Sequence, residues 1–125
     1  MATLRHERYY LDDREPTVAN ERAEEMGYLG ENAGKRTLES EFDERGFEHE
    51  ELGTLELGAL DPTATLYEYE KDGKTRYGVE WTERPVIDDY VIRSLIFDAE
   101  PECEDVATAL TIENHRRENP GWRRR

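Results

Sequence analysis

Most of the bulky apolar side chains lie in one stretch, Ala64 to Phe97, which reads ATLYEYEKDGKTRYGVEWTERPVIDDYVIRSLIF. Within it, Asp72 and Gly73 separate two runs that are rich in aromatic and β-branched residues. Asp-Gly between such runs is a strong signal for a β-hairpin, because glycine adopts a positive φ at no steric cost. The stretch therefore predicts a hairpin around which the rest of the chain is organised.

Two registers of this hairpin compete. A two-residue turn over Asp72-Gly73 pairs Lys71 with Lys74 and separates the aromatic side chains of the two strands onto opposite faces. A three-residue loop with Gly73 as a bulge pairs Glu68 with Arg76 instead. It also gathers one apolar face: Tyr67, Tyr69, Thr75, Tyr77, Val79 and Trp81. Because this register leaves one aromatic face and one charged face, it is the register that we predict.

Tyr67, Tyr69, Tyr77 and Trp81 would then form a common aromatic surface. Such a surface builds a core when a helix covers it. Left open, it is a platform on which a ligand or nucleic-acid bases can stack. Both interpretations follow from the same predicted register.

The remaining pattern predicts an α+β domain. Strands are expected at 4–11, 52–60 and 86–97, and a loop at 28–34. Helices are expected at 18–26, 35–45 and 102–117, with a strand as the alternative for the second of them. The fold predicted is a mostly antiparallel sheet of about four strands, with two N-terminal helices and one C-terminal helix on one face. Residues 1–118 would form this single domain, followed by an arm at 119–125.

The composition is strongly acidic. The 125 residues include 31 Asp and Glu against 17 Lys and Arg, a net charge of −14, and only Lys35, Lys71 and Lys74 are lysines. This composition resembles that of proteins from salt-accumulating archaea, and the resemblance implies a halophilic source. High salt would suit such a chain, because the repulsion among its acidic side chains is screened within about 3 Å at 1 M salt.

Few side chains indicate chemistry. Cys103 is the single cysteine, and His6, His49 and His115 show no metal-ligand spacing, so we predict no metal, no cofactor and no catalytic residue. No apolar run has the length of a membrane span, and the N-terminus lacks a signal-peptide core. These patterns predict a cytoplasmic protein, or a virion component assembled in the cytoplasm.

The C-terminal segment has the opposite charge to the rest of the chain. Residues 115–125 hold five Arg and one Glu, a net charge of +4. Because the whole chain carries −14, residues 1–114 carry −18. Such asymmetry is typical of a contact arm. Its candidate partner-binding residues are Arg116, Arg117, Trp122, Arg123, Arg124 and Arg125. The segment could equally be a solubilising tail.

Three functions are compatible with these features. The first is a non-enzymatic protein–protein interaction or assembly component of a halophilic archaeon or of a virus infecting one, which docks through the arm and the aromatic face. The second is a small nucleic-acid-associated regulator that uses the same arm, although high salt disfavours phosphate contacts. The third is a small-molecule binder or enzyme with a pocket on the aromatic face.

Overall fold

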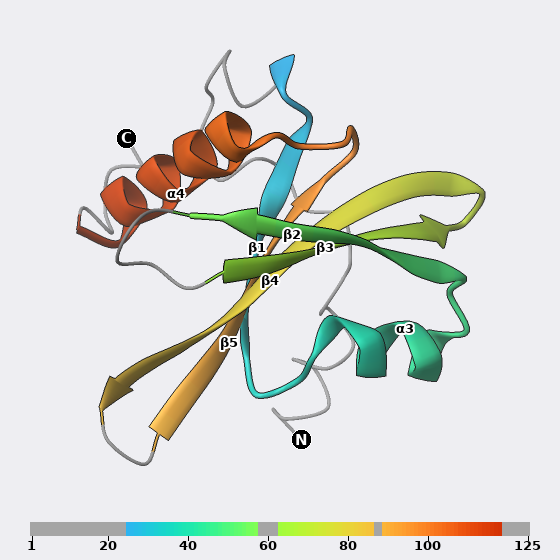
Figure 1. Ribbon diagram of the computed structural model, residues 1–125, viewed down its shortest axis with the longest axis horizontal. Helices are drawn as coiled ribbons and strands as arrows, with labels where there is room; N and C mark the ends of the chain where they lie inside the picture. Colours follow the sequence, from blue (N-terminus) through green and yellow to red (C-terminus); the bar gives the residue numbers. More distant parts are fainter. Residues whose placement is uncertain (1–24, 58–62, 87–88, 119–125) are drawn as a thin grey trace.

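A five-stranded antiparallel sheet and two helices make up the part of the protein that the computed structural model describes, residues 25–57, 63–86 and 89–118 (Figure 1). In chain order the elements are β1 (Tyr28–Gly34), α3 (Leu38–Arg45), β2 (His49–Glu56), β3 (Thr63–Lys71), β4 (Lys74–Val86), β5 (Asp89–Phe97) and α4 (Cys103–Glu118). The order of the strands in the sheet is β1-β5-β4-β3-β2. Strands β2 to β5 are thus sequential neighbours. The chain passes from one edge of the sheet to the other through α3.

The α+β class is confirmed, but the sheet has one strand more than the sequence predicted. The additional strand is β1, which occupies the segment that we predicted to be a loop. Its two glycines and Asn32 have little preference for a strand. Pairing imposes the conformation instead, because β1 hydrogen-bonds along the edge of β5, with a register shift between Tyr28 and Gly30.

The hairpin register predicted from the sequence is wrong. Lys71 lies opposite Lys74, and Glu68 lies opposite Tyr77 rather than Arg76. Asp72 and Gly73 have φ angles of 52° and 77°, as a two-residue type I′ turn requires. This turn follows the right-handed twist of the two strands, which a type I turn does not.

The register predicted from the sequence would leave only one face of the hairpin apolar. In the structure both faces of the hairpin are buried. Tyr67 and Tyr69 lie on one face, and Tyr77, Val79 and Trp81 lie on the other. Residues that face each other across a ladder share a face, so the same alternation runs through β5. The single aromatic surface predicted from the sequence is therefore not formed.

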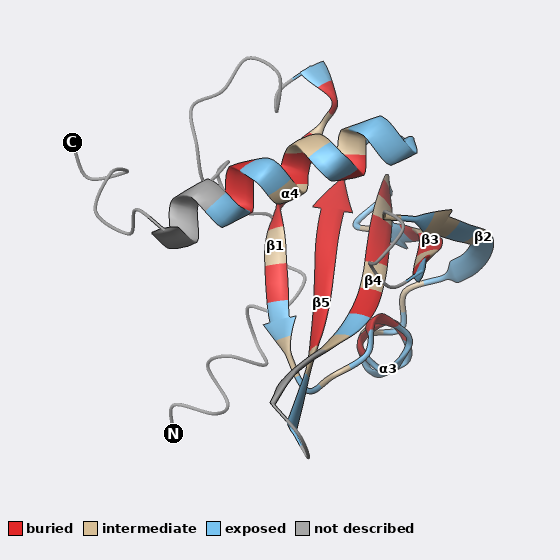
Figure 2. Ribbon diagram, turned by 60° about the vertical axis from the view of Figure 1, so that its left-hand side comes forward, coloured by how far each residue is buried: buried red, intermediate tan, exposed pale blue. Residues whose placement is uncertain are grey.

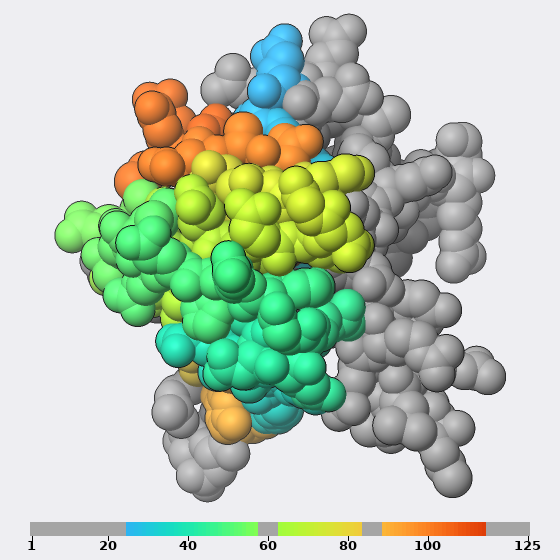
Figure 3. Space-filling view, turned by 90° about the vertical axis from the view of Figure 1, so that its right-hand side faces the viewer, coloured from blue at the N-terminus to red at the C-terminus, as the bar shows by residue number. Residues whose placement is uncertain are grey.

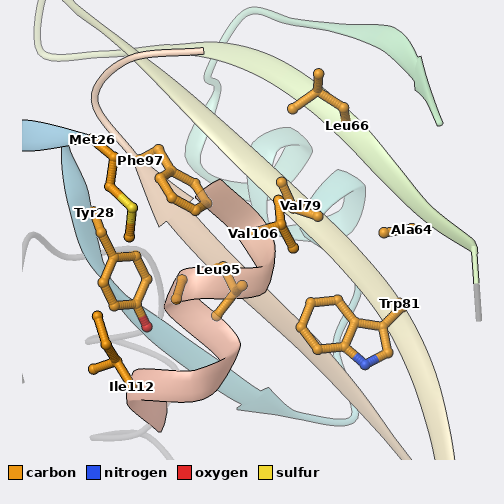
Figure 4. Close-up of a cluster of buried hydrophobic side chains, with 11 residues drawn as sticks. Met26, Tyr28, Ala64, Leu66, Val79, Trp81, Leu95, Phe97, Val106 and Ile112 are labelled. Carbon is orange, nitrogen blue, oxygen red and sulfur yellow. The ribbon is translucent and has the colours of Figure 1, made fainter. Parts of the chain in front are cut away.

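One face of the sheet packs against α4 (Figure 4). The buried side chains between them, called the α4 core here, are Met26, Tyr28, Ala64, Leu66, Val79, Trp81, Leu95, Phe97, Val106, Ala109 and Ile112. Val79 and Leu95 are opposite one another on β4 and β5, and both are fully buried. α4 contributes Val106, whose side chain points at this pair in Figure 4.

The opposite face packs against α3 and forms the α3 core: Leu38, Phe42, Tyr67, Tyr69 and Ile96. The ring of Phe42 lies 4.6 Å from that of Tyr69 and 5.8 Å from that of Tyr67, measured between centroids. The two described helices thus cover opposite faces, and the prediction that all helices lie on one face is wrong. A five-stranded sheet with two apolar faces needs cover on both.

The sequence predicts the end of α3 correctly but places its start three residues early, at 35 instead of Leu38. Thr37 caps its N-terminus by accepting a hydrogen bond from Ser40 N–H at 3.2 Å, and Gly46 ends it in the left-handed conformation with a φ of 71°. A helix of eight residues is too short to be stable alone. Its fully buried Leu38 and Phe42 therefore supply the stability through contact with the sheet.

Several predictions lie outside the described residues. They are the strand at 4–11, almost all of the helix at 18–26, the end of the strand at 52–60, and the arm at 119–125. The other strands and the C-terminal helix are confirmed, with ends shifted by a few residues.

Gly78 gives a direct test of the register. A Cβ built on this residue would lie 2.6 Å from Leu38 Cδ1, because Leu38 packs over the bare backbone of β4. We expect Gly78→Ala to lower the free energy of unfolding by about 1–3 kcal/mol through overpacking. Gly34→Ala is the control, because no atom lies within 4 Å of its Cβ position.

Chemical denaturation of both single variants and of Leu38→Ala/Gly78→Ala measures the effect. The double variant should lose less stability than the sum of its parts, since the smaller side chain leaves room for the new methyl group. Additive losses would contradict the placement of Leu38 over Gly78.

Candidate interaction surface

A buried ion-pair network lies on the α4 side of the sheet and is centred on Arg93 of β5. Its guanidinium donates from Nε to Glu31 Oε2 at 3.0 Å and from Nη1 to Glu83 Oε2 at 2.6 Å. Trp81 Nε1 donates to the same Glu83 oxygen at 2.8 Å, and Arg93 lies over the Trp81 ring at 5.2 Å. The network joins β1, β4 and β5.

Burial and charge act in opposite directions on Arg93. Burial alone would lower its pKa, but the hydrogen bonds and the attraction from Glu31 and Glu83 outweigh it, so the pKa is raised. The guanidinium thus stays charged, and its fork-shaped donors are shared between two carboxylates. This arrangement ties strands together and leaves no free base for catalysis.

Glu113 holds α4 on the sheet. Its carboxylate is fully buried and accepts a hydrogen bond from the Tyr28 hydroxyl. The Tyr28 ring in turn packs against Phe97, with 5.4 Å between centroids. A buried carboxylate without hydrogen bonds would be costly, so this contact fixes where along β1 the helix lies.

A second polar group lies on the α3 side. Glu80 accepts a hydrogen bond from the backbone N–H of Leu38 at the start of α3, and Tyr67 donates from its hydroxyl to Glu39 Oε1 at 2.8 Å. Burial raises the pKa of Glu80. The Leu38 N–H opposes that rise, and the charge on Glu39 adds to it. Burial likewise raises the pKa of Tyr67, helped by its hydrogen bond to Glu39.

The polar groups around Arg93, Glu113 and Glu80 therefore position helices and strands. In the described part of the chain, no set of three or more His, Cys, Asp or Glu side chains could hold a metal ion. Cys103 and His49 are both exposed and lie on different elements. Among the described helices none is long and apolar enough to cross a bilayer.

The most exposed regular element among the described residues is the edge strand β2, which pairs only with β3 (Figure 2). Six of its eight residues are exposed and two are half-buried. The other edge strand, β1, has three buried residues, three half-buried ones and a single exposed one. Figure 3 shows the chain around β2 at the surface, beside the β3–β4 hairpin. β2 is thus an accessible sheet edge.

The outward-pointing backbone groups of β2 follow from its pairing. Glu70 N–H donates to Glu48 C=O at 2.9 Å, so even-numbered residues of β3 point toward β2. The partner of Ala64 is Leu55, which consequently points inward. The N–H and C=O groups of Thr54 and Glu56 therefore point away from the sheet and can pair with a further strand.

The side chains of this edge are acidic and partly apolar. Residues 48–56 contain Glu48, Glu50, Glu51 and Glu56 and neither Lys nor Arg, a net charge of −4. Leu52 is 38% exposed and is one of two large exposed hydrophobic residues in the described part of the chain. It lies at the bulge that shifts the register between Glu51 and Gly53.

The residues predicted to form an aromatic surface are now placed. Tyr67, Tyr69 and Trp81 are buried, and Tyr77 is half-buried beside the α4 core. They belong to two opposite faces, so they do not converge on one site. Of the arm, Arg116 and Arg117 belong to α4, but their side chains are not described. Trp122 and Arg123 to Arg125 lie outside the described residues.

Sequence reasoning missed β2 as an edge because it began the strand at 52, whereas β2 begins at His49. Three glutamates in eight residues, interrupted by Gly53, are a pattern typical of protected edge strands. That signal was available.

Comparison with known proteins finds no matching family model, no similar curated protein and no similar solved structure.

Loss of Arg93 should remove the cationic partner of Glu31, whose side chain is only 6% exposed, and of the more exposed Glu83. We expect Arg93→Ala to lower the free energy of unfolding by about 3–5 kcal/mol. Lys35→Ala, which removes an ion pair whose side chains are 56% and 55% exposed, is the control and should have little effect. Denaturation at constant salt measures both. The triple variant Glu31→Gln/Glu83→Gln/Arg93→Met should recover part of the loss, and no recovery would contradict a charge-based explanation.

Glu80→Gln should stabilise the protein at neutral pH, because it removes a buried charge and keeps an acceptor for Leu38 N–H. The raised pKa of Glu80 means that the folded state binds its proton more tightly than the unfolded state. The ionised Glu80 of the wild type therefore destabilises the fold less as pH falls from neutral through the raised pKa toward the ordinary pKa of 4.5. The advantage of the variant should shrink over that interval.

Unfolding midpoints of wild type and variant across this pH range test the sign. Glu56→Gln removes one exposed surface charge and is the matched control for net charge. An advantage that grows on acidification would show that Glu80 is better solvated than its burial indicates.

Proposed function

We propose that the protein is a non-enzymatic assembly component whose contact surface is the free edge of β2. The observation that carries the proposal is the exposure of β2 along its length, with backbone groups of Thr54 and Glu56 directed outward. Unpaired strand edges recruit further strands, and several recognition domains use this mode of binding.

The buried polar groups support a structural role. Arg93, Glu113 and Glu80 each hold an element of the fold, and none of them is open to a substrate. A pocket on the aromatic face, one of the alternatives, loses its basis because Tyr67 and Trp81 lie on opposite faces. The nucleic-acid alternative depends on the arm and stays a prediction.

The proposed setting is a salt-loving archaeon or a virus infecting one, with the protein in the cytoplasm or in the virion. The acidic composition supports it, since 31 acidic residues repel one another least when salt screens them. Contacts through backbone hydrogen bonds suit that setting, because they depend less on salt than ion pairs do.

Light scattering on the full chain at about 2 M salt tests the function. At this salt concentration the Debye length is about 3 Å or less. We expect the wild type to form a defined oligomer. Thr54→Pro removes an outward N–H and places a ring at the edge, which should reduce the oligomer to a single chain of 14.7 kDa.

Thr54→Ala is the matched control, because it removes the side chain and keeps the N–H, so the oligomer should persist. Circular dichroism verifies that each variant is folded. A wild type that stays monomeric over the whole concentration range would overturn the proposal.

A further inference from the structure

We infer that the strand added to β2 is the basic C-terminal arm, residues 121–125, of a second copy of this chain. The inference rests on the proposed function and names the occupant of the edge. It combines an exposed acidic strand with a basic segment that begins just beyond the end of α4 at Glu118.

The first argument is charge. The edge carries −4 over residues 48–56, and residues 121–125, the proposed added strand, carry +3 from three arginines. The remainder of the chain is acidic, so this segment is the one stretch of the sequence with a strong excess of positive charge. Opposite charges across a new pair of strands select the partner, while backbone hydrogen bonds, which salt weakens less, hold the strands together.

The second argument excludes the simplest alternative, in which the β2 strands of two copies pair with each other. That arrangement would gather the −4 charge of residues 48–56 from both copies along one pair of strands. Like charges directly opposite one another are destabilising in a sheet. The acidic side chains therefore select against self-pairing of β2 and admit a basic strand.

The third argument is size and anchoring. Five extended residues span about 17 Å, enough to pair with about half of an eight-residue strand. Trp122 gives the arm one large apolar side chain, and Leu52 gives the edge an exposed apolar one. Trp and Arg together dominate the binding energy of many protein interfaces. The arm thus provides an anchor as well as charge.

A complementation experiment with full-length and arm-deleted chains tests the inference. A chain lacking residues 119–125 keeps the edge and loses the arm, whereas Thr54→Pro keeps the arm and loses the edge. Each should be monomeric alone. A mixture of the two should form a complex of about twice the 14.7 kDa chain mass, since one intact contact remains between them.

The controls separate this inference from the proposed function. If the arm-deleted chain still assembles while Thr54→Pro does not, the edge binds another occupant: the function stands and the inference fails. If both variants are monomeric and the mixture does not associate, the arm of one chain does not pair with the edge of another, which also overturns the inference. If Thr54→Pro assembles and the arm-deleted chain does not, the arm acts elsewhere and both proposals fail.

Charge variants provide a second measurement in case Thr54→Pro does not fold. Glu50→Arg/Glu51→Arg places positive charge on exposed positions of the edge and should abolish association. Combining it with Arg123→Glu, Arg124→Glu and Arg125→Glu in the same chain should restore the oligomer. Association that is unchanged by the edge variant would overturn the inference.

Discussion

The two-residue turn at Asp72-Gly73 is the constraint on which the rest of the structure depends. Both residues have positive φ, and this conformation matches the twist of the strands that it joins. It fixes Lys71 opposite Lys74 and thereby decides which way every side chain of β3 and β4 points. The hairpin acquires two apolar faces. Each face then requires a helix, which places α3 and α4 on opposite sides of the sheet.

The same constraint explains how a chain with 35% hydrophobic residues can cover a sheet on both sides. The apolar side chains are divided between two clusters, and polar side chains complete each of them. Arg93 is shared between Glu31 and Glu83, and Glu113 accepts from Tyr28. Charged pairs inside a protein are costly to desolvate, so their geometry is specific rather than simply stabilising. Arg93, one of the two buried arginines among the described residues, has a carboxylate on each side.

The sequence predicted the elements better than their arrangement. The Asp-Gly turn and the helical pattern of residues 35–45 located the hairpin and α3, because each is a local signal with a local cause. The register was missed because it depends on what covers the second face, which no local pattern records. Strand β1 was missed for a related reason: its conformation comes from the edge of β5 and not from its own residues.

The candidate site was predictable only in part. The basic arm was evident from charge alone, but an arm does not identify the surface that it contacts. The surface that we propose for it, the β2 edge, depends on the pairing of Leu55 with Ala64, because the alternation then directs the backbone groups of Thr54 outward. An edge strand is a liability in any sheet protein, and acidic side chains are one way to guard it. Guarding by charge is selective, because it repels copies of the same edge and accepts a strand of opposite sign. In the proposed assembly, the acidic composition of the chain and the selectivity of the β2 edge would have the same physical origin, the mutual repulsion of carboxylates.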